Sequence, residues 1–358
     1  MNILSLFDGI SCARVACDRA VIKVNKYWAS EIDKYALQVS KKNYPDSIYL
    51  GNVKDIYTID YPIELIIGGS PCQDLSIAKK NREGLEGSRS SLFYDYVRLV
   101  RMILPKYFIL ENVYSMPKEA KAIISHELFG IEPVMINASL VSAQNRKRLF
   151  WVGKRDSSLL SGVTYRKVDI SQPEDRGILL RDILQPKVSE SHYVKPKSNT
   201  VRSSGRGSGI DDKHNWDTIR IGSLNSGGQG DRIYSTDGKS VSLSANGGGR
   251  GAKTGLYAVS QRGRNIVDGK RKDILGAKTQ QRIEIGGTDK AHTITSVTKD
   301  SMVMQDSVIR KLTPIECERL QGLPDNYTEG ISDTQRYKCL GNAFNVDVVA
   351  HILKHLEV

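Results

Sequence analysis

Short apolar segments typical of buried strands alternate with amphipathic segments along the first 155 residues, and this alternation limits the fold more than any other feature. The expected strands are Ile3–Phe7, Tyr27–Ser30, Leu65–Ile67, Phe108–Leu110, Val134–Ile136 and Leu149–Val152. The expected helices are Cys12–Val21, Lys34–Asn43, Ser90–Leu104 and Lys118–Glu127. Such alternation favours an α/β fold, in which a mostly parallel sheet is flanked by helices. Ligands of such sheets bind beyond the carboxyl ends of the strands, so a site is expected there.

The composition changes after about residue 180. Residues 181–308 hold 18 of the 31 glycines, and 21 lysines and arginines against 13 acidic residues, so they carry +8 of the total net charge of +12. A flexible glycine-rich linker would have this composition, but apolar residues recur there at strand spacing, for example in Asp231–Thr236 and Lys239–Leu243. We therefore expect a small β-rich domain with basic loops, which would bind an anionic partner such as nucleic acid.

Helical patterns return at Thr313–Gly322 and Asn345–Leu356, which gives three expected units: residues 1–180, 181–308 and 309–358. The first residues show no basic n-region or cleavage site, and no uncharged apolar stretch approaches the roughly 20 residues that span a bilayer. We therefore expect a soluble, intracellular protein with no membrane partner. The five cysteines form no CxxC pair and the histidines lack metal-ligand spacing, so we expect neither a disulfide framework nor a metal site.

One cysteine stands out by its position. Cys72 lies in the segment Gly68-Gly-Ser-Pro-Cys-Gln-Asp-Leu-Ser76, directly after an expected buried strand. A lone thiol is most often buried and inert, whereas a thiol in a Gly- and Pro-rich turn at the edge of a sheet is fixed and accessible. The thiolate is the reactive form, so catalysis would require neighbours that lower the thiol pKa from its usual value of about 8.5. We therefore expect Cys72 to be a nucleophile and not a buried, inert thiol.

Charged residues follow the neighbouring strands. Glu111 ends the fourth expected strand, where partial desolvation would suit it to proton donation, although a surface carboxylate is the simpler interpretation. Arg146 and Arg148 lie two positions apart on an extended segment and so would point to one face, where they could grip a phosphate or a base edge. An exposed basic turn explains them equally well. Phe7-Asp-Gly9 before a helix, and Glu31 after the next strand, fit a nucleotide-type cofactor.

Six segments occur in the order and with the spacing of the motifs of one known family. They are Phe7-Asp-Gly9, Glu31, Pro71-Cys72-Gln73, Glu111-Asn-Val113, Gln144-Asn-Arg146-Lys-Arg148 and Gly341-Asn342. With these segments the chain resembles the C5-cytosine DNA methyltransferase family. The segment Lys311-Leu-Thr-Pro-Ile-Glu-Cys-Glu-Arg-Leu-Gln-Gly-Leu-Pro324 is similar to the penultimate conserved block of that family. The resemblance covers about residues 1–155 and 309–358, and residues 181–308 lie where the family has its variable target-recognition domain.

The resemblance implies a Rossmann-like fold that binds S-adenosylmethionine, an inserted recognition domain, and DNA (cytosine-5)-methyltransferase activity. In the mechanism of the family a cysteine thiolate adds to C6 of cytosine, C5 takes the methyl group and then loses its proton, and elimination frees the cysteine. Cys72 would be this nucleophile, and Glu111 would engage the N3 edge of the base. Arg146 would hold the base and its phosphate, and Arg148 would support the catalytic loop. The target cytosine would have to be flipped out of the duplex.

The resemblance also implies which residues bind the cofactor, whose product would be S-adenosylhomocysteine. These residues are Phe7, Gly9, Glu31, Asn52, Pro71, Leu92, Asn342 and Ala343. Phe7 would pack against the adenine, and Glu31 would bind the ribose. The chain departs from the family at Ser11 and Cys12, which replace glycines, at Asn52, which replaces an adenine-binding aspartate, and at Phe344, where valine is commoner.

For contact with DNA, the resemblance and the basic composition indicate Gln73, Ser76, Arg232, Arg250, Arg262 and Arg264. We expect a bacterial or phage modification enzyme, a cytoplasmic, nucleoid-associated monomer that acts on double-stranded DNA, with a cognate restriction endonuclease as a partner to test. Two other interpretations stay open. An RNA cytosine-5 methyltransferase on the same frame is disfavoured by the long insert. A non-catalytic, sequence-specific DNA-binding protein is disfavoured by the presence of Cys72, Glu111 and Arg146.

Overall fold

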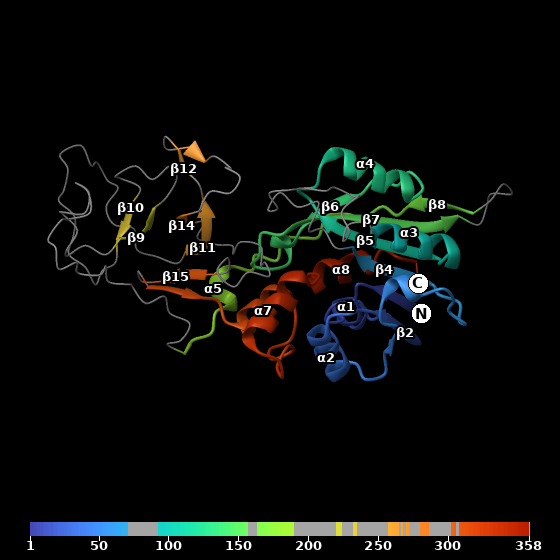
Figure 1. Cartoon of the computed structure of the whole chain (residues 1–358), viewed down its shortest axis with the longest axis horizontal. Helices are drawn as coiled ribbons and strands as arrows, with labels where there is room; N and C mark the ends of the chain where they lie inside the picture. Colours follow the sequence, from blue (N-terminus) through green and yellow to red (C-terminus); the bar gives the residue numbers. More distant parts are fainter. Residues whose placement is uncertain are drawn as a thin grey trace.

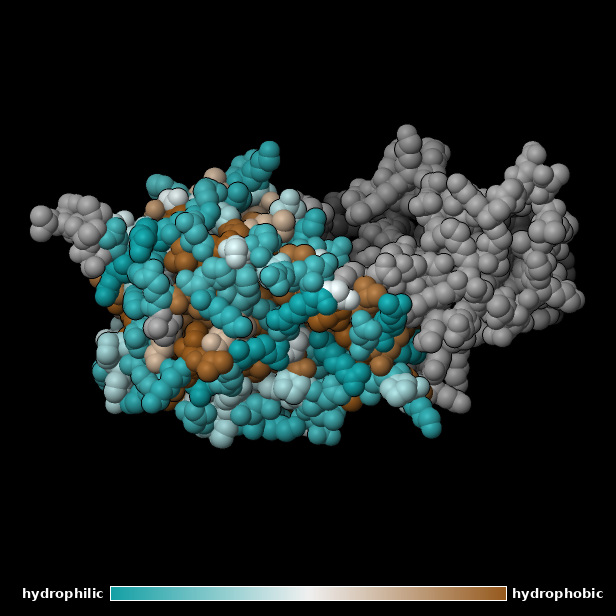
Figure 2. All heavy atoms as spheres, turned by 180° about the vertical axis from the view of Figure 1, so that it is seen from behind, coloured by the Kyte–Doolittle hydropathy of each residue, from teal (hydrophilic) through white to brown (hydrophobic). Residues whose placement is uncertain are grey.

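The structure is a computed structural model, and it describes residues 1–70, 92–156, 163–189 and 308–357 together with short strands between residues 220 and 305. Between residues 220 and 309 it describes the backbone of the strands and one side chain, that of Val303. The large sheet and its helices lie to the right in Figure 1, and the second sheet lies to the left. The face seen in Figure 2 is mainly hydrophilic where it is described, with scattered hydrophobic residues. Within the described ranges no helix is long and apolar enough to cross a membrane.

The large sheet has eight strands in the order β3-β2-β1-β4-β5-β7-β6, with β8 also paired to β7. The strands are β1 (Asn2–Leu6), β2 (Lys26–Ser30), β3 (Ile48–Tyr49), β4 (Leu65–Gly69), β5 (Tyr107–Val113), β6 (Val134–Asn137), β7 (Lys147–Asp156) and β8 (Thr164–Lys167). Neighbours from β3 to β5 run parallel, whereas β7 runs antiparallel to β5, β6 and β8. All six expected strands are confirmed, and β3 and β8 were not expected.

Helices cover both faces of this sheet. One core contains residues of α1 (Cys12–Arg19), α2 (Lys34–Asn43), α6 (Pro314–Leu320), α7 (Asp333–Asn342) and α8 (Val346–Leu353). The other contains residues of α3 (Leu92–Ile103) and α4 (Lys118–Glu127). Short helices lie at η1 (Val53–Asp55), η3 (Ala138–Leu140) and α5 (Leu180–Ile183). In Figure 1, α4 lies above the sheet, and α1 and α2 lie below it.

Side-chain alternation in β5 decides which face carries the polar residues. Tyr107 and Ile109 belong to the core with α1 and α8, whereas Phe108 and Leu110 belong to the core with α3 and α4. Strands buried on both faces are apolar throughout, as parallel strands between helices must be. Because side chains alternate, Glu111 continues the row of Tyr107 and Ile109 and so faces the C-terminal helices.

The second sheet confirms the expected β-rich character for the strands that are described. Its order is β10-β9-β14-β11-β15-β16, and β12 and β13 form a separate pair. The strands are β9 (Arg220–Ser223), β10 (Arg232–Tyr234), β11 (Tyr257–Arg264), β12 (Ile266–Val267), β13 (Lys270–Arg271), β14 (Gln280–Ile285), β15 (Met302–Gln305) and β16 (Val308–Lys311). β10 lies in the expected strand 231–236, whereas the expected strand 239–243 lies outside the described residues. β16 continues to Lys311, past the expected boundary at residue 308.

A buried ion pair joins this sheet to the C-terminal helices. Two guanidinium nitrogens of Arg310, in β16, donate to the two carboxylate oxygens of Glu316, each at 2.8 Å. Glu316 also accepts from the backbone N–H of Thr313 and of Gln185, both at 2.8 Å. Gln185 lies near the start of residues 181–308 and Arg310 lies just after their end, so one carboxylate contacts both ends of this segment.

We predict that Arg310→Met lowers the free energy of unfolding by about 3 to 5 kcal/mol, because the substitution leaves the buried Glu316 carboxylate without its cation. Asp325→Ala is the matched control, since the Arg319–Asp325 pair is half-exposed and such pairs contribute about 1 kcal/mol or less. Urea unfolding followed by circular dichroism measures both. Equal losses in the two variants would contradict the prediction.

Candidate active site

The turn between β1 and α1 has an unusual backbone. Phe7, Gly9 and Ser11 all have positive φ, at 56°, 60° and 59°. Positive φ is costly for residues other than glycine, and such strain is common at functional sites. The replacement of glycine by Ser11 therefore does not prevent the left-handed turn.

A buried carboxylate stabilises this turn from behind. Asp8 is 5% exposed and accepts hydrogen bonds from the hydroxyls of Ser11 and Tyr27, each at 2.6 Å. Its backbone N–H donates to the carbonyl of Ser30 at 3.0 Å. Burial raises the pKa of Asp8, while the hydrogen bonds from Ser11 and Tyr27 act against this rise. Asp8 thus fixes the turn to β2.

Glu31 lies at the carboxyl end of β2 and is fixed by backbone groups. One carboxylate oxygen accepts from the N–H of Gly9 at 2.9 Å. The other accepts from the N–H groups of Ile32 and Asp33, at 2.7 and 2.8 Å. Two carboxylate oxygens offer about four acceptor positions, so a position is left for a ligand hydroxyl. The geometry fits the role expected for Glu31, an acceptor for ribose hydroxyls.

Two further positions flank this acid. Asn52 caps the helix η1, and its side-chain oxygen accepts from the N–H of Lys54 at 3.1 Å, which leaves its amide N–H groups to donate to a ligand. Ile32 is 71% exposed next to Glu31, and sequence reasoning did not single it out. An exposed large apolar side chain beside this carboxylate would suit the flat face of an adenine. The exposure of Ile32 could not be read from the sequence.

The remaining expected cofactor residues lie at two helix ends. Leu92 is the first residue of α3 and is partly buried. Asn342 is the exposed last residue of α7, and Ala343 after it is buried. These positions, with the turn at Phe7 and Gly9, give an apolar and hydrogen-bonding edge suited to S-adenosylmethionine. Pro71 lies outside the described residues.

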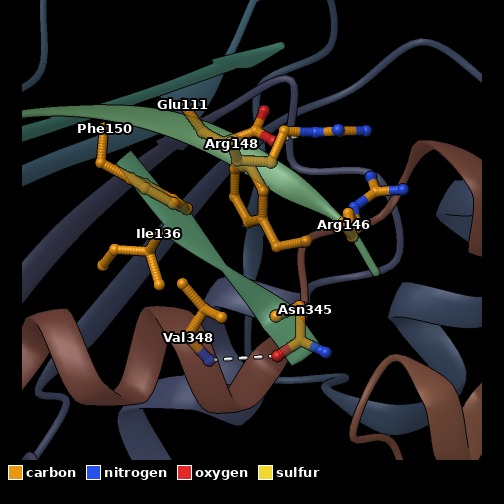
Figure 3. Close-up of a pocket in the computed structure, with 9 residues that line it drawn as sticks. Glu111, Ile136, Arg146, Arg148, Phe150, Asn345 and Val348 are labelled. Atoms are coloured by element: carbon orange, nitrogen blue, oxygen red, sulfur yellow. Dashed lines mark hydrogen bonds and ion pairs between the residues drawn. The ribbon is translucent and has the colours of Figure 1, made fainter. Parts of the chain in front are cut away.

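Glu111 and Arg148 form an ion pair at the end of the sheet. Nε of Arg148 lies 2.8 Å from a carboxylate oxygen of Glu111, and both side chains are mostly buried. Glu111 is opposite Phe150 in the register of β5 and β7, so Arg148 is its diagonal neighbour on the same face. Figure 3 shows the two charged groups together at the rim of a pocket.

Arg146 has a different environment from Arg148. Arg146 is 4% exposed, and its guanidinium group donates to the carbonyl of Ala343 at 2.9 Å and of Gly341 at 3.3 Å. Arg146 was expected to hold the base and Arg148 to support the loop. In the structure Arg148 contacts Glu111, whereas Arg146, which precedes β7, contacts the C-terminal segment. In Figure 3 the guanidinium of Arg146 points away from Glu111.

The pocket beside this pair holds about 10 Å³, room for about one water molecule. Its lining residues come from β5, β6, β7 and the C-terminal segment, and they are Glu111, Ile136, Ala138, Arg146, Arg148, Phe150, Phe344, Asn345 and Val348. In Figure 3 the N–H of Val348 donates to the side chain of Asn345, at 3.1 Å. The pocket is therefore a narrow space beside the charged pair.

Four cysteines lie in the described residues, and all of them, Cys12, Cys17, Cys317 and Cys339, are buried free thiols, as expected. Burial raises the pKa of the Cys17 and Cys339 thiols to about 12 and that of the other two still higher. Thiols with such pKa values are almost fully protonated at neutral pH and are poor nucleophiles. Cys72 is the fifth cysteine, and it lies outside the described residues.

The expected DNA contacts fall largely outside the described residues. Gln73, Ser76 and Arg250 lie there entirely. Arg232 is in β10, and Arg262 and Arg264 are in β11, where only the backbone is described. Among the residues whose positions are described, no group of three or more His, Cys, Asp or Glu side chains could hold a metal ion.

Comparison with known proteins assigns the sequence to one family. Residues 1–357 match the family of C-5 cytosine-specific DNA methylases. The orphan methyltransferase M.SPRI of Bacillus phage SPR is 27% identical, over 99% of this chain and 97% of its own. The type II methyltransferase M.HhaI of Haemophilus parahaemolyticus is also 27% identical, over 98% of this chain and 93% of its own.

A solved structure shows the same fold. A methyltransferase candidate encoded by a prophage of E. coli superposes with a TM-score of 0.59 at 21% identity, over 99% of this chain and 98% of that one. The matching architecture is an α/β fold with a mostly parallel sheet, as the sequence predicted.

We predict that Ser11→Ala destabilises the protein more than Ser11→Gly does. Both variants lose the hydrogen bond to Asp8, but glycine adopts a φ of 59° freely, whereas alanine pays about 1 kcal/mol or more. Thermal unfolding and titration with S-adenosylhomocysteine measure the difference. If alanine proves the better replacement, the left-handed conformation of residue 11 is wrong.

Proposed function

The chain belongs to the C-5 cytosine-specific DNA methylase family and is a DNA (cytosine-5)-methyltransferase, and on this premise we propose which of its residues perform the reaction. The observation that carries the proposal is the Glu111–Arg148 ion pair at the end of β5. In the parallel pairing of β4 and β5, Glu111 is opposite Gly69, three residues before Cys72. The chain thus reaches Cys72 three residues after the position that pairs with the acid, and the four cysteines in the described residues are buried.

Cys72 is the nucleophile in this proposal. Its thiolate forms a bond to C6 of a flipped-out cytosine, and Glu111 stabilises the negative charge that develops toward N3 by a hydrogen bond or proton at that atom. S-adenosylmethionine supplies the methyl group that C5 accepts. Loss of the C5 proton to a base and breakage of the bond between sulfur and C6 then restore the aromatic ring and the free cysteine.

Arg148 takes the role next to the base. Its guanidinium fixes the Glu111 carboxylate and has further N–H donors that can reach the cytosine or its phosphate. Arg146 is the supporting arginine, because its donors are directed to the carbonyls of Gly341 and Ala343. We thus exchange the roles that the resemblance suggested for the two arginines.

The cofactor is held by the turn after β1 and the end of β2. Glu31 accepts from the ribose hydroxyls, Phe7 and Ile32 flank the adenine, and Asn52 hydrogen-bonds its edge. The backbone near Gly9, Pro71, Leu92, Asn342 and Ala343 completes the site. The two N–H groups of the Asn52 amide suit the ring nitrogens of adenine, which accept hydrogen bonds.

Residues 181–308 are the target-recognition domain, and 1–180 with 309–358 form the catalytic domain. The net charge of +8 in the recognition domain favours the phosphate backbone of double-stranded DNA. Gln73 and Ser76 would contact DNA near the flipped base, and Arg232, Arg250, Arg262 and Arg264 would lie in or along the groove. We propose a cytoplasmic monomer that works at the nucleoid and protects its target sites against a cognate restriction endonuclease.

Covalent trapping tests the nucleophile. With S-adenosylmethionine and duplex DNA that carries 5-fluorocytosine at the target, the wild-type protein should form an adduct stable to denaturation, because fluorine cannot leave as a cation. Cys72→Ser should form none, and Cys17→Ala, which removes a buried thiol of α1, should form it as the wild type does. Bisulfite sequencing of DNA from expressing cells identifies the target beforehand. An adduct in Cys72→Ser, or none in the wild type on its methylated target, would refute the mechanism.

The two arginines should differ in what they lose. Arg148→Met should lower kcat by about 10²-fold or more, the usual effect of removing one electrostatic group from a reaction centre, with little change in stability. Arg146→Met should lower the free energy of unfolding by about 1 to 3 kcal/mol, because it leaves buried carbonyls without donors. Single-turnover methylation and urea unfolding separate the two effects. The opposite pattern would restore the original assignment of roles.

A further inference from the structure

Phe344 lies in the short link between α7 and α8, and its backbone is held from both sides. The carbonyl of Ala343 accepts from Arg146 at 2.9 Å. The side chain of Asn345 donates to the carbonyl of Leu320 at 3.0 Å, and it accepts from the N–H of Val348 at 3.1 Å. Phe344 itself is 9% exposed. The backbone at Phe344 is therefore fixed by hydrogen bonds of its two neighbours, Ala343 and Asn345.

The ring rests on a glycine at the end of β4. A methyl group added to Gly69 would lie 2.7 Å from Cε1 of Phe344 and 3.2 Å from its Cζ, closer than carbon atoms can approach. Gly69 does not have a positive φ, so its backbone would accept an ordinary residue. The requirement for glycine at this position comes from the ring of Phe344.

The same spot touches the catalytic acid. The methyl group added to Gly69 would also lie 3.1 Å from Oε2 of Glu111. The other oxygen of this carboxylate, Oε1, is bound by Arg148. Arg148 thus holds one oxygen, and the space for the other is bounded by Gly69 and the ring. Phe344 and Glu111 also line the same pocket, which has a volume of about 10 Å³.

We propose that Phe344 is a positioning residue for the methyl transfer. This inference rests on the proposed function of Glu111 and Cys72. The ring fixes where the Glu111 carboxylate lies and where β4 ends before the chain continues to Cys72, so that the acid and the nucleophile meet the same base. It touches neither reacting atom in this role. The chain combines a bulky aromatic side chain at residue 344 with a glycine at residue 69, whose lack of a side chain leaves room for the ring.

A double-mutant cycle tests this coupling. Gly69→Ala should lower the single-turnover methylation rate by about 10²-fold, the effect of misplacing reacting groups by about 1 Å, because the new methyl group displaces the ring and the carboxylate. Phe344→Val should lower the rate several-fold and leave the dissociation constant for DNA unchanged. In the double variant, valine gives the space that the methyl group needs, so its rate should exceed that of Gly69→Ala at least tenfold.

The chain offers a matched control far from the reaction centre. Gly153 in β7 packs on Phe108 in the same way, since an added methyl group would lie closer to that ring than carbon atoms can approach. Gly153→Ala should lower the unfolding temperature and leave the rate per folded molecule unchanged. If Phe344 had only a structural role, Phe344→Val would likewise lower the unfolding temperature and leave the rate per folded molecule unchanged.

Several outcomes would overturn the proposal. One is an equal loss of rate by Gly69→Ala in the wild-type and Phe344→Val backgrounds, and another is an unchanged rate in Phe344→Val. If Gly69→Ala does not fold, Phe344→Leu and Phe344→Ala decide, because a positioning role requires the rate to fall as the side chain shrinks while DNA affinity is kept. Wild-type protein that traps 5-fluorocytosine through Cys72 but shows no coupling refutes the role of Phe344 alone. Failure to trap refutes the proposed function itself.

Discussion

The geometry of the site depends on the hydrogen bonds that the guanidinium group of Arg146 makes with the C-terminal segment. This group is buried between the sheet and the C-terminal segment, where it donates to the carbonyls of Gly341 and Ala343, almost 200 residues later in the chain. A buried cation is tolerated because its donors are directed to carbonyl dipoles, which replace part of the lost hydration. This contact joins the link between α7 and α8 to the residue that precedes β7, and the core that Ala343 and Phe344 share with Phe150 packs the link against the sheet. Phe344 and Asn345, which line the pocket, belong to this link, and Asn342 immediately precedes it.

The sequence predicted the large sheet well because the apolar segments of parallel strands are short, continuous and bounded by turns. It also predicted which residues follow these strands, such as Glu31 after β2 and Glu111 at the end of β5. It did not predict α7, because only Tyr337, Cys339 and Leu340 of that helix are buried. Nor did it predict that β7 runs antiparallel, because strand direction depends on partners and not on the pattern within a strand.

The two arginines lie two positions apart in the chain, but their contacts differ. A separation of two residues places side chains on one face only while the backbone stays extended. Arg148 lies within β7, whereas Arg146 precedes it, and the carbonyl of Arg146 accepts from the N–H of Ala138 at 3.0 Å. Similar residues two positions apart therefore meet different partners, one the Glu111 carboxylate and the other the backbone of Gly341 and Ala343. Only the tertiary contacts distinguish the two arginines.

The departures from the family pattern have the same physical explanation. Ser11 takes a left-handed conformation that costs about 1 kcal/mol, and its hydroxyl gains a hydrogen bond to the buried Asp8 that glycine could not make. Phe344 brings a ring into a crowded space, and Gly69 provides that space by having no side chain. In each case a residue that is unfavourable alone is compatible with a particular neighbour. The site is therefore specified by pairs of residues. A single substitution at Gly69 or Ser11 consequently tests the contact with Phe344 or Asp8, and not only the substituted residue.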